Sequence, residues 1–351
     1  MILFTGLTND KAYRTALAKG VGCKAKDLKS VMGANELKQF LQTAKPENFD
    51  PASPDFCVNL HLHTTASDGK FTPETLFNEI IKQDNKFVVS ITDHDTTDGV
   101  KKALEYIAKE TKKNLDKFKN VRFAPGIEFF GKYENSKLMK RPFELELLGY
   151  GINPYSKEFK AFEQGNRSKD RKVIDSVIRK AREDYGVDTF DFKEYKKSKI
   201  LLNVPSGVHV EYLLKQYLQG KGLSETNRKD LFKDYFPSGI PTLGKILKAS
   251  KGAIVGISHP MRMKNFYAHI KDKNLSEEEA LLKFFKDFKE QGGQAAEGRY
   301  YLPPERKNQV RILPGKHIDA KKTLIADLCD QAGLLKTGGI DNHGTSLYKF
   351  L

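Results

Sequence analysis

Five histidines stand beside carboxylates in short motifs, each directly after a stretch expected to form a β-strand. The motifs are Asn59-Leu60-His61-Leu62-His63 with Ser67-Asp68-Gly69, Thr92-Asp93-His94-Asp95, Gly126-Ile127-Glu128, Ser258-His259-Pro260 and Gly339-Ile340-Asp341-Asn342-His343-Gly344. Neutral imidazole and ionised carboxylate are the ligands with which hydrolytic sites hold several divalent metals. The pattern therefore predicts a metal-dependent enzyme.

The spacing of these residues strengthens that prediction. His61 and His63 are two residues apart, so in a strand their side chains project from the same face. A single histidine at a strand end is more often a hydrogen-bonded core residue than a ligand. Chance would rarely repeat the arrangement at five equivalent places along one chain.

The elements that must position these residues alternate between strands and helices. A helix is expected to start at Thr72-Pro73-Glu74. Thr72 would cap the helix, Pro73 would take its first position, and Glu74 would lie at the positive end of the helix dipole. Another helix is expected over residues 99–112. Such alternation predicts an α/β fold with parallel strands, and in a closed barrel the carboxyl ends of the strands converge on one mouth. Seven strands are expected, over residues 56–60, 87–91, 121–129, 143–150, 253–257, 295–301 and 334–340.

Four regions are expected along the 351 residues. Residues 1–54 form an N-terminal helical extension that ends in Asp50-Pro51-Ala52-Ser53-Pro54, whose two prolines indicate a linker or a domain edge. Residues 55–155 form the first part of a barrel and residues 245–351 the second. Residues 156–244 lack strand patterns and are expected to form a helical insertion or cap.

The composition favours a globular chain with a basic surface. It is 39% hydrophobic with a formal net charge of +15, which either attracts phosphate-rich partners or is an ordinary solvated surface. Cys23, Cys57 and Cys329 lie far apart, so neither a disulfide framework nor a cysteine zinc site is expected, and a cytoplasmic protein is the simplest interpretation. The segment Met1–Thr5 does not resemble a signal peptide, and no stretch approaches the roughly 20 apolar residues of a membrane span.

As an ordered set, these motifs resemble the polymerase-and-histidinol-phosphatase (PHP) superfamily of metal-dependent phosphoesterases. The resemblance rests on His61-Leu62-His63-Thr64, Ile91-Thr92-Asp93-His94-Asp95-Thr96 and the three later motifs, and it covers about residues 55–155 and 245–347. It implies a distorted (β/α)7 barrel and two or three divalent metal ions, which are Mn, Fe or Zn.

The resemblance also implies a role for each motif residue. One metal would be held by His61, His63, Glu128 and Asp341, and a second by Asp68, His94 and His343. A third would take Glu128, as a bridge, and His259. Its remaining ligand is usually a histidine, but this chain has Glu146 at that place, and carboxylate can still ligate. The chain also has Asn59 where the family often has Asp.

Within the superfamily, the chain is most similar to the branch of nucleoside 3′,5′-bisphosphate phosphatases and 5′-to-3′ exoribonucleases. The insertion carries Arg167 and Arg171 on one helical stripe, where they would clamp phosphate or else lie in a solvated first turn. Arg262 follows His259 closely and would bind a phosphate. His209 lies in a Gly-Val-His motif of this branch, although a packed or capping histidine explains it equally well.

The expected reaction is hydrolysis of phosphate esters of nucleotides or 5′-phosphorylated oligonucleotides by a metal-bridging hydroxide. Arg262 would neutralise charge on the transferring group, and Asp93 or a metal-bound water would handle the leaving-group proton. The alternatives are a small-molecule phosphatase of the histidinol-phosphate type, a metal-dependent amidohydrolase, and a non-catalytic domain that binds metal or nucleic acid. The sequence leaves the oligomeric state open.

Overall fold

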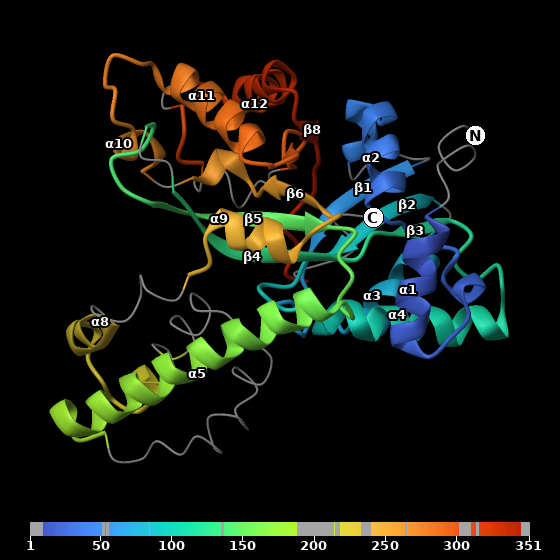
Figure 1. Cartoon of the computed structure of the whole chain (residues 1–351), viewed down its shortest axis with the longest axis horizontal. Coiled ribbons are helices and arrows are strands. Elements are labelled where there is room, and N and C mark those ends of the chain that lie inside the picture. Colours follow the sequence, from blue (N-terminus) through green and yellow to red (C-terminus); the bar gives the residue numbers. More distant parts are fainter. Residues whose placement is uncertain are drawn as a thin grey trace.

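The fold is described from a computed structural model of the chain (Figure 1). The structure describes residues 10–50, 53, 56–83, 85–134, 137–187, 214, 218–232, 240–263, 265–301, 310–313 and 316–344. Within the helix over residues 157–185, the side chains of residues 167–171, 173 and 174 lie outside this description. The linker residues 51, 52, 54 and 55 also lie outside it.

The first sheet is parallel and carries the earliest site motifs. It contains β1 (Phe56–Leu62), β2 (Lys86–Ile91) and β3 (Val121–Phe123) in that order. All of β1 is buried, as expected for a strand covered on both faces. Its carboxyl end therefore holds His61 and His63 inside the molecule.

The second sheet is mixed. It runs β4 (Gly126–Tyr133), β5 (Phe143–Tyr150), β6 (Ile254–Ile257), β7 (Ala295–Ala296) and β8 (Leu335–Lys336). Strand β5 is antiparallel to both β4 and β6, whereas β6, β7 and β8 are parallel. The expectation of parallel strands throughout is therefore wrong for β5. A parallel pair needs a long crossover, and the segment between β4 and β5 is too short to provide one.

The single strand expected over residues 121–129 is two strands, β3 and β4, in different sheets. Ala124 and Pro125 separate them, and proline cannot donate a hydrogen bond to a ladder. The described residues consequently contain eight strands where the sequence predicted seven. The expected strands over 295–301 and 334–340 are also much shorter than predicted, as β7 and β8.

Isolated bridges connect the two sheets at two places beside the site motifs. His94, after β2, pairs with Glu128 of β4, and Leu62 of β1 pairs with Asn342. The amide of His63 also donates to the carbonyl of Asn342 at 3.0 Å. These contacts bring together segments that are far apart in the sequence. The α/β class predicted from the sequence is confirmed.

Helices of the N-terminal half cover the first sheet. α1 (Lys11–Val21), α3 (Pro73–Ile81) and α4 (Asp98–Lys113) share one apolar cluster with β1, β2 and β3. The predicted start of α3 is confirmed, because the Thr72 hydroxyl accepts from the amide of Thr75 at 3.1 Å. α2 (Ala34–Thr43) and two short 3-10 helices, η2 (Ala25–Leu28) and η3 (Pro46–Phe49), complete this half. Residues of the N-terminal extension, such as Leu17 and Leu37, are therefore part of the core.

A second apolar cluster joins the second sheet to the C-terminal helices. These helices are α9 (Leu243–Ala249), α10 (Phe266–His269), α11 (Glu277–Glu290), α12 (Ile318–Ala332) and the 3-10 helix η4 (Pro260–Arg262). Phe284, Phe285 and Phe288 of α11 are fully buried in this cluster. Figure 1 shows α11 and α12 together on one side of the strands.

The insertion contributes α5 (Lys157–Tyr185) and α8 (Glu225–Phe232). Figure 1 shows α5 reaching away from the sheets, with only its first part beside them. That part is fixed by Glu163, which accepts from the amide and the hydroxyl of Thr97, both at 2.7 Å, next to the start of α4. The described part of the chain contains no helix long and apolar enough to span a membrane. The division into four regions stays a prediction.

Candidate metal centre

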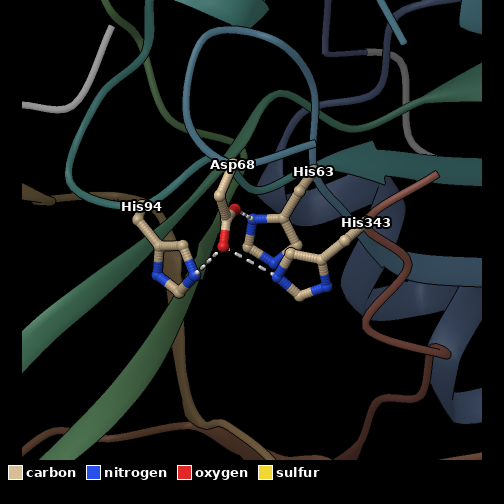
Figure 2. Close-up of side chains that lie close together, drawn as sticks. All are labelled: His63, Asp68, His94 and His343. Carbon is tan, nitrogen blue, oxygen red and sulfur yellow. Dashed lines mark ion pairs between the residues drawn. The ribbon is translucent and has the colours of Figure 1, made fainter. Parts of the chain in front are cut away.

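Three predicted histidine ligands, each from a separate segment, surround the carboxylate of Asp68 (Figure 2). Its Oδ2 lies 3.0 Å from His343 Nε2 and 3.8 Å from His94 Nε2, and its Oδ1 lies 3.5 Å from His63 Nδ1. His63 stands after β1 and His94 after β2, whereas His343 comes from the C-terminal segment. The bridges between the sheets explain why these segments meet.

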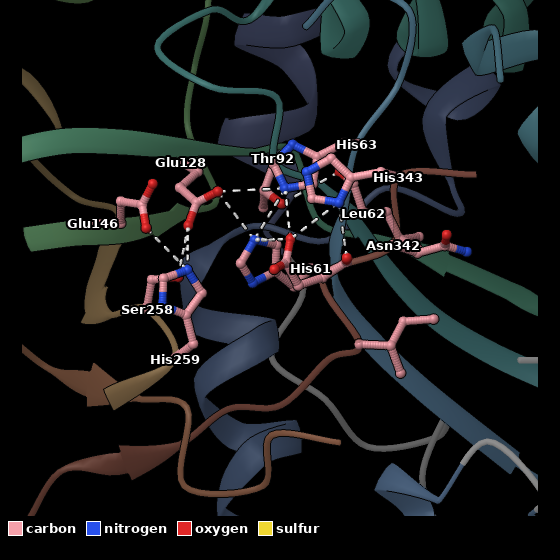
Figure 3. A network of polar contacts seen from close by, with 12 residues as sticks. His61, Leu62, His63, Thr92, Glu128, Glu146, Ser258, His259, Asn342 and His343 are labelled. Atoms are coloured by element: carbon pink, nitrogen blue, oxygen red, sulfur yellow. Dashed lines mark hydrogen bonds and ion pairs between the residues drawn. The ribbon is translucent and has the colours of Figure 1, made fainter. Parts of the chain in front are cut away.

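A second group shares His63 with the first and is centred on Glu128 of β4 (Figure 3). Glu128 Oε2 lies 3.1 Å from His61 Nε2 and 3.3 Å from His63 Nε2. Asp341 Oδ1 approaches the same two imidazoles, at 3.6 Å and 3.3 Å. His61 and His63 therefore project together, as their spacing predicts.

The third group lies on the other side of Glu128. His259 Nε2 is 3.4 Å from Glu128 Oε1 and 3.1 Å from Glu146 Oε2 (Figure 3). The carboxylates of Glu128 and Glu146 also lie close to His94. The glutamate that replaces the expected histidine is thus at the site, with its side chain 28% exposed.

The spacing of these atoms fits bound metal ions. Ligand bonds of about 2.0–2.2 Å place two ligand atoms of one ion roughly 3–3.5 Å apart. Most distances within the three groups fall in or near that range, with donor types that suit Zn, Mn or Fe. The nine predicted ligands are brought together without exception, namely His61, His63, Asp68, His94, Glu128, Glu146, His259, Asp341 and His343.

The buried charges of the site stabilise one another. Burial opposes protonation of His63, but its contacts with Asp341 and Glu128 raise its pKa to about 10. Burial also opposes protonation of His259, whose contacts with Glu128 and Glu146 raise its pKa to about 9. Conversely, the histidines lower the pKa of Glu128 and Asp341 well below the ordinary range despite burial of these carboxyls. Glu128 and Asp341 are therefore ionised, and the imidazoles of His63 and His259 hold protons that a metal would displace.

Two of the ligand residues adopt a left-handed backbone conformation. The φ angle is 22° at His259 and 51° at Asp341, and Asp95, beside His94, has a φ of 50°. Non-glycine residues in such conformations are strained and concentrate at functional sites. The surrounding structure therefore holds the backbone of these residues in a strained conformation, and this fixes the positions of their side chains.

The carboxylate of Asp93 is hydrogen-bonded to the loop that carries Asp68. It accepts from the amide and hydroxyl of Thr64, both at 2.7 Å, and from the hydroxyl of Ser67 at 2.8 Å. It is fully buried, and a Cβ at Gly99 would lie 2.0 Å from its Oδ2, so only glycine permits this approach. The predicted transfer of a proton from Asp93 to a leaving group stays a prediction.

Arg262 is at the site as predicted, and its guanidinium contacts Asp341 Oδ2. The side chain of Arg262 is 25% exposed, so it can also reach a bound molecule. Arg167 and Arg171 belong to α5, but their side chains lie outside the described residues, and so does His209. Phosphate binding by these three residues stays a prediction.

The sequence reasoning missed three side chains that hold the ligands. Glu297, directly after β7, lies 3.1 Å from His61 Nδ1 and accepts from the amide of His259. The Ser258 hydroxyl donates to Glu128 Oε1 at 2.6 Å, and Glu163 anchors the loop after His94. Glu297 could have been found, because an acid following Ala295-Ala296 occupies the same strand-end place as the predicted ligands. Nothing local marks Glu163 among the other charged residues of its helix.

Comparison with known proteins finds relatives among exoribonucleases. No protein-family model matches the chain. Over 126 residues it is 31% identical to 5′-3′ exoribonuclease Rnm of Salmonella typhimurium, and over 127 residues it is 31% identical to the Rnm of Escherichia coli. Each alignment covers 35% of this chain and 38% of the relative. The resemblance to PHP phosphoesterases is thereby confirmed, over a little more than a third of these relatives' length.

The fold is also shared with a solved structure from Bifidobacterium adolescentis that is provisionally described as a metal-dependent phosphoesterase. The TM-score is 0.50 at 20% sequence identity, and the match covers 82% of this chain and 87% of the other. At this identity the likeness concerns the fold alone.

Proposed function

We propose that this chain is a metal-dependent phosphoesterase that hydrolyses phosphate esters of nucleotides or of 5′-phosphorylated oligonucleotides. The observation that carries the proposal is the position of Glu128, whose two carboxylate oxygens face His61, His63 and His94 on one side and His259 on the other. A fully buried carboxylate shared by several histidines is the arrangement expected of a bridging ligand between adjacent metals. The Rnm relatives, by their name, act on RNA, which supports a nucleotide substrate.

The proposed ligand sets follow the three groups, with His63, which two groups share, assigned to the ion beside His61. His61, His63, Glu128 and Asp341 hold one ion, and Asp68, His94 and His343 hold another. The third ion is held by Glu128, Glu146 and His259. This is a harder ligand set than one with a histidine in place of Glu146. We therefore propose two or three ions of Mn, Fe or Zn, the third being the weakest. When bound, such ions polarise a phosphoryl oxygen and acidify water near neutral pH.

The chain's own side chains would bind and orient the substrate. Arg262 is near enough to the ligands to neutralise charge on a phosphate while keeping Asp341 oriented. Arg167, Arg171 and His209 are proposed to contact a second phosphate or the rest of the substrate. Asp93 is proposed to hold the Thr64–Asp68 loop, so a solvent molecule would supply the leaving-group proton.

The two sheets are proposed to form one distorted (β/α)7 barrel around this centre. The His94–Glu128 and Leu62–Asn342 bridges support it, because they connect the segment after β2 to β4, and β1 to the segment after β8. Several ligands follow the carboxyl ends of strands, which is where barrel enzymes place their chemistry, whereas Glu128 and Glu146 lie within β4 and β5. The insertion over residues 156–244 would then cover part of the mouth, and the cytoplasmic location stays a prediction.

A substrate panel with added Mn²⁺ tests the proposal. It compares a nucleoside 3′,5′-bisphosphate, a 5′-phosphorylated oligonucleotide, histidinol phosphate and an amide substrate, with metal content measured on the same preparation. Hydrolysis of the first two, lost in His94→Ala, supports the proposal. Preference for histidinol phosphate would favour the small-molecule phosphatase, and amide cleavage would favour an amidohydrolase. Bound metal without any turnover would favour a non-catalytic domain.

A further inference from the structure

Glu297 is a fully buried carboxylate at the centre of the site that none of the three ligand groups includes. It is 1% exposed and follows the short buried strand β7. A carboxylate in such a place is costly unless it is hydrogen-bonded or paired. Its surroundings must therefore supply donors, and they do so from two different ligand residues.

The first donor is His61. Glu297 Oε1 lies 3.1 Å from His61 Nδ1, while the opposite nitrogen, Nε2, lies 3.1 Å from Glu128. A proton on Nδ1 would leave the lone pair of Nε2 free to bind a metal. Glu297 therefore selects the tautomer and ring orientation that ligation by His61 requires, since a carboxylate on the far nitrogen fixes both.

The second donor belongs to His259. Glu297 Oε2 accepts the backbone N–H of His259 at 2.5 Å and lies 3.5 Å from the Ser258 hydroxyl. His259 is the residue with the strained φ of 22°. The hydrogen bond to its amide therefore helps to hold the peptide in the conformation that aims the imidazole at Glu128 and Glu146.

We infer that Glu297 is a positioning residue that orients His61 and His259 together, and so links the ligand set of the first metal to that of the third. The inference rests on the proposed metal binding, but neither the ligand sets nor the comparisons assign Glu297 a role. Carboxylates that orient a metal-bound histidine typically change metal affinity by about 10–100-fold when they are lost.

Titration of the metal-free protein with Mn²⁺ tests this inference, because it measures affinity and stoichiometry without any assay of activity. Glu297→Gln keeps the size of the side chain but replaces one acceptor with a donor. We expect it to weaken Mn²⁺ binding by about 10–100-fold. Glu290→Gln makes the same change at an exposed position at the end of α11, and it should bind like the wild type.

A double-mutant cycle with His61 separates positioning from a general loss of structure. If Glu297 acts on the first metal through His61, adding Glu297→Gln to His61→Ala should weaken that site by much less than Glu297→Gln does alone. A fully additive loss would overturn the inference. So would wild-type affinity in a folded Glu297→Gln protein.

Two further outcomes are also decisive. If circular dichroism shows that Glu297→Gln is unfolded, Glu297→Asp is measured instead, since it keeps the charge and shortens the reach. A folded Glu297→Asp protein that binds Mn²⁺ as tightly as the wild type would then overturn the inference, and weaker binding would support it. If the wild-type protein itself binds no metal, the proposed function is wrong, and the inference about Glu297 is wrong with it.

Discussion

The carboxylate of Glu146 lies 3.1 Å from His259 Nε2, at the place where a histidine was expected from the resemblance. The pairing depends on strand β5 running antiparallel between β4 and β6, which sets Glu146 opposite Phe130 and its backbone carbonyl next to the amide of Ser258. Contact with His259 lowers the pKa of Glu146, although burial and the nearby Glu128 oppose this. The glutamate is therefore ionised and able to ligate.

The first prediction is that Glu146 controls the third metal. Glu146→Ala should remove about one ion per chain at limiting metal and leave the other two ions bound, because Glu146 contacts His259 and belongs to neither of the other two proposed ligand sets. Glu146→His should retain activity and shift preference from Mn²⁺ towards Zn²⁺, since imidazole is the softer ligand. Elemental analysis and rates with each metal measure both effects. Unchanged metal content and rate in both variants would make Glu146 a bystander.

The second prediction concerns His94, whose imidazole contacts Glu128 at 3.3 Å and Asp68 at 3.8 Å. His94→Ala removes a ligand that lies between two of the groups. Loss of a residue that merely supports a metal ligand lowers activity by up to about 100-fold, so loss of the ligand itself should lower phosphoesterase turnover by more than that. The fold should persist, as judged by circular dichroism. His317→Asn is the control, because His317 is exposed at the cap of α12 and asparagine also caps well. Full activity in His94→Ala would refute the ligand assignment.

The third prediction separates two roles for Asp93. If this carboxylate holds the Asp68 loop, Asp93→Asn should weaken metal binding by roughly tenfold and slow all substrates alike. If it gives a proton to the leaving group, Asp93→Asn should slow a nucleotide far more than p-nitrophenyl phosphate, whose leaving group needs no proton. Steady-state rates on both substrates with saturating Mn²⁺ decide between them. The three hydrogen bonds to Thr64 and Ser67 favour the first result.

The fourth prediction is that metal binding depends on pH. The pKa of His63 is raised to about 10 and that of His259 to about 9, so in the metal-free protein both carry protons at neutral pH. Metal ligation requires neutral imidazole, so binding should release protons and tighten as pH rises from about 7 to about 9. Calorimetry in buffers of different ionisation enthalpy measures the release. Binding without proton release would contradict the charge state deduced for the site.

The same shifts predict the stability of the metal-free protein. Because folding raises the pKa of both histidines above the ordinary 6.5, their contribution is fully present below about pH 6.5 and is lost as pH rises through about 9 to about 10. The melting temperature should therefore fall between neutral pH and about pH 10, and added Mn²⁺ should reduce that loss. Melting curves with and without metal measure the difference.

The site was more predictable than the fold that carries it. Ligands such as His61 and Asp341 are recognisable because metal chemistry restricts residue type and each follows an apolar strand pattern. The pattern does not specify strand direction, so the antiparallel β5 was missed, and the break at Pro125 was hidden within one apolar run. Glu297 was missed because a carboxylate that orients a histidine has no required spacing in sequence, only in space.

The last prediction concerns substrate choice and the role of Arg262. Its guanidinium contacts Asp341 and remains partly exposed, so it can orient this ligand and also bind a phosphate. A charge-assisted hydrogen bond to phosphate contributes roughly 1.5–3 kcal/mol, which corresponds to about a ten- to a hundredfold change in catalytic efficiency. Arg262→Ala should therefore lower kcat/KM for a nucleoside 3′,5′-bisphosphate by that factor, with a much smaller loss for p-nitrophenyl phosphate.

Arg171→Ala tests the predicted contribution of the insertion to the same second phosphate, and Arg179→Ala, an exposed arginine on the same helix, is its matched control. We expect Arg171→Ala to behave like Arg262→Ala on the bisphosphate and Arg179→Ala to behave like the wild type. Metal content must be measured in Arg262→Ala, because loss of its contact with Asp341 would slow both substrates together. Equal losses on both substrates at full metal occupancy would argue against a second phosphate site. The small-molecule phosphatase would then be the better description, since a simple monoester needs only the metal-binding side chains.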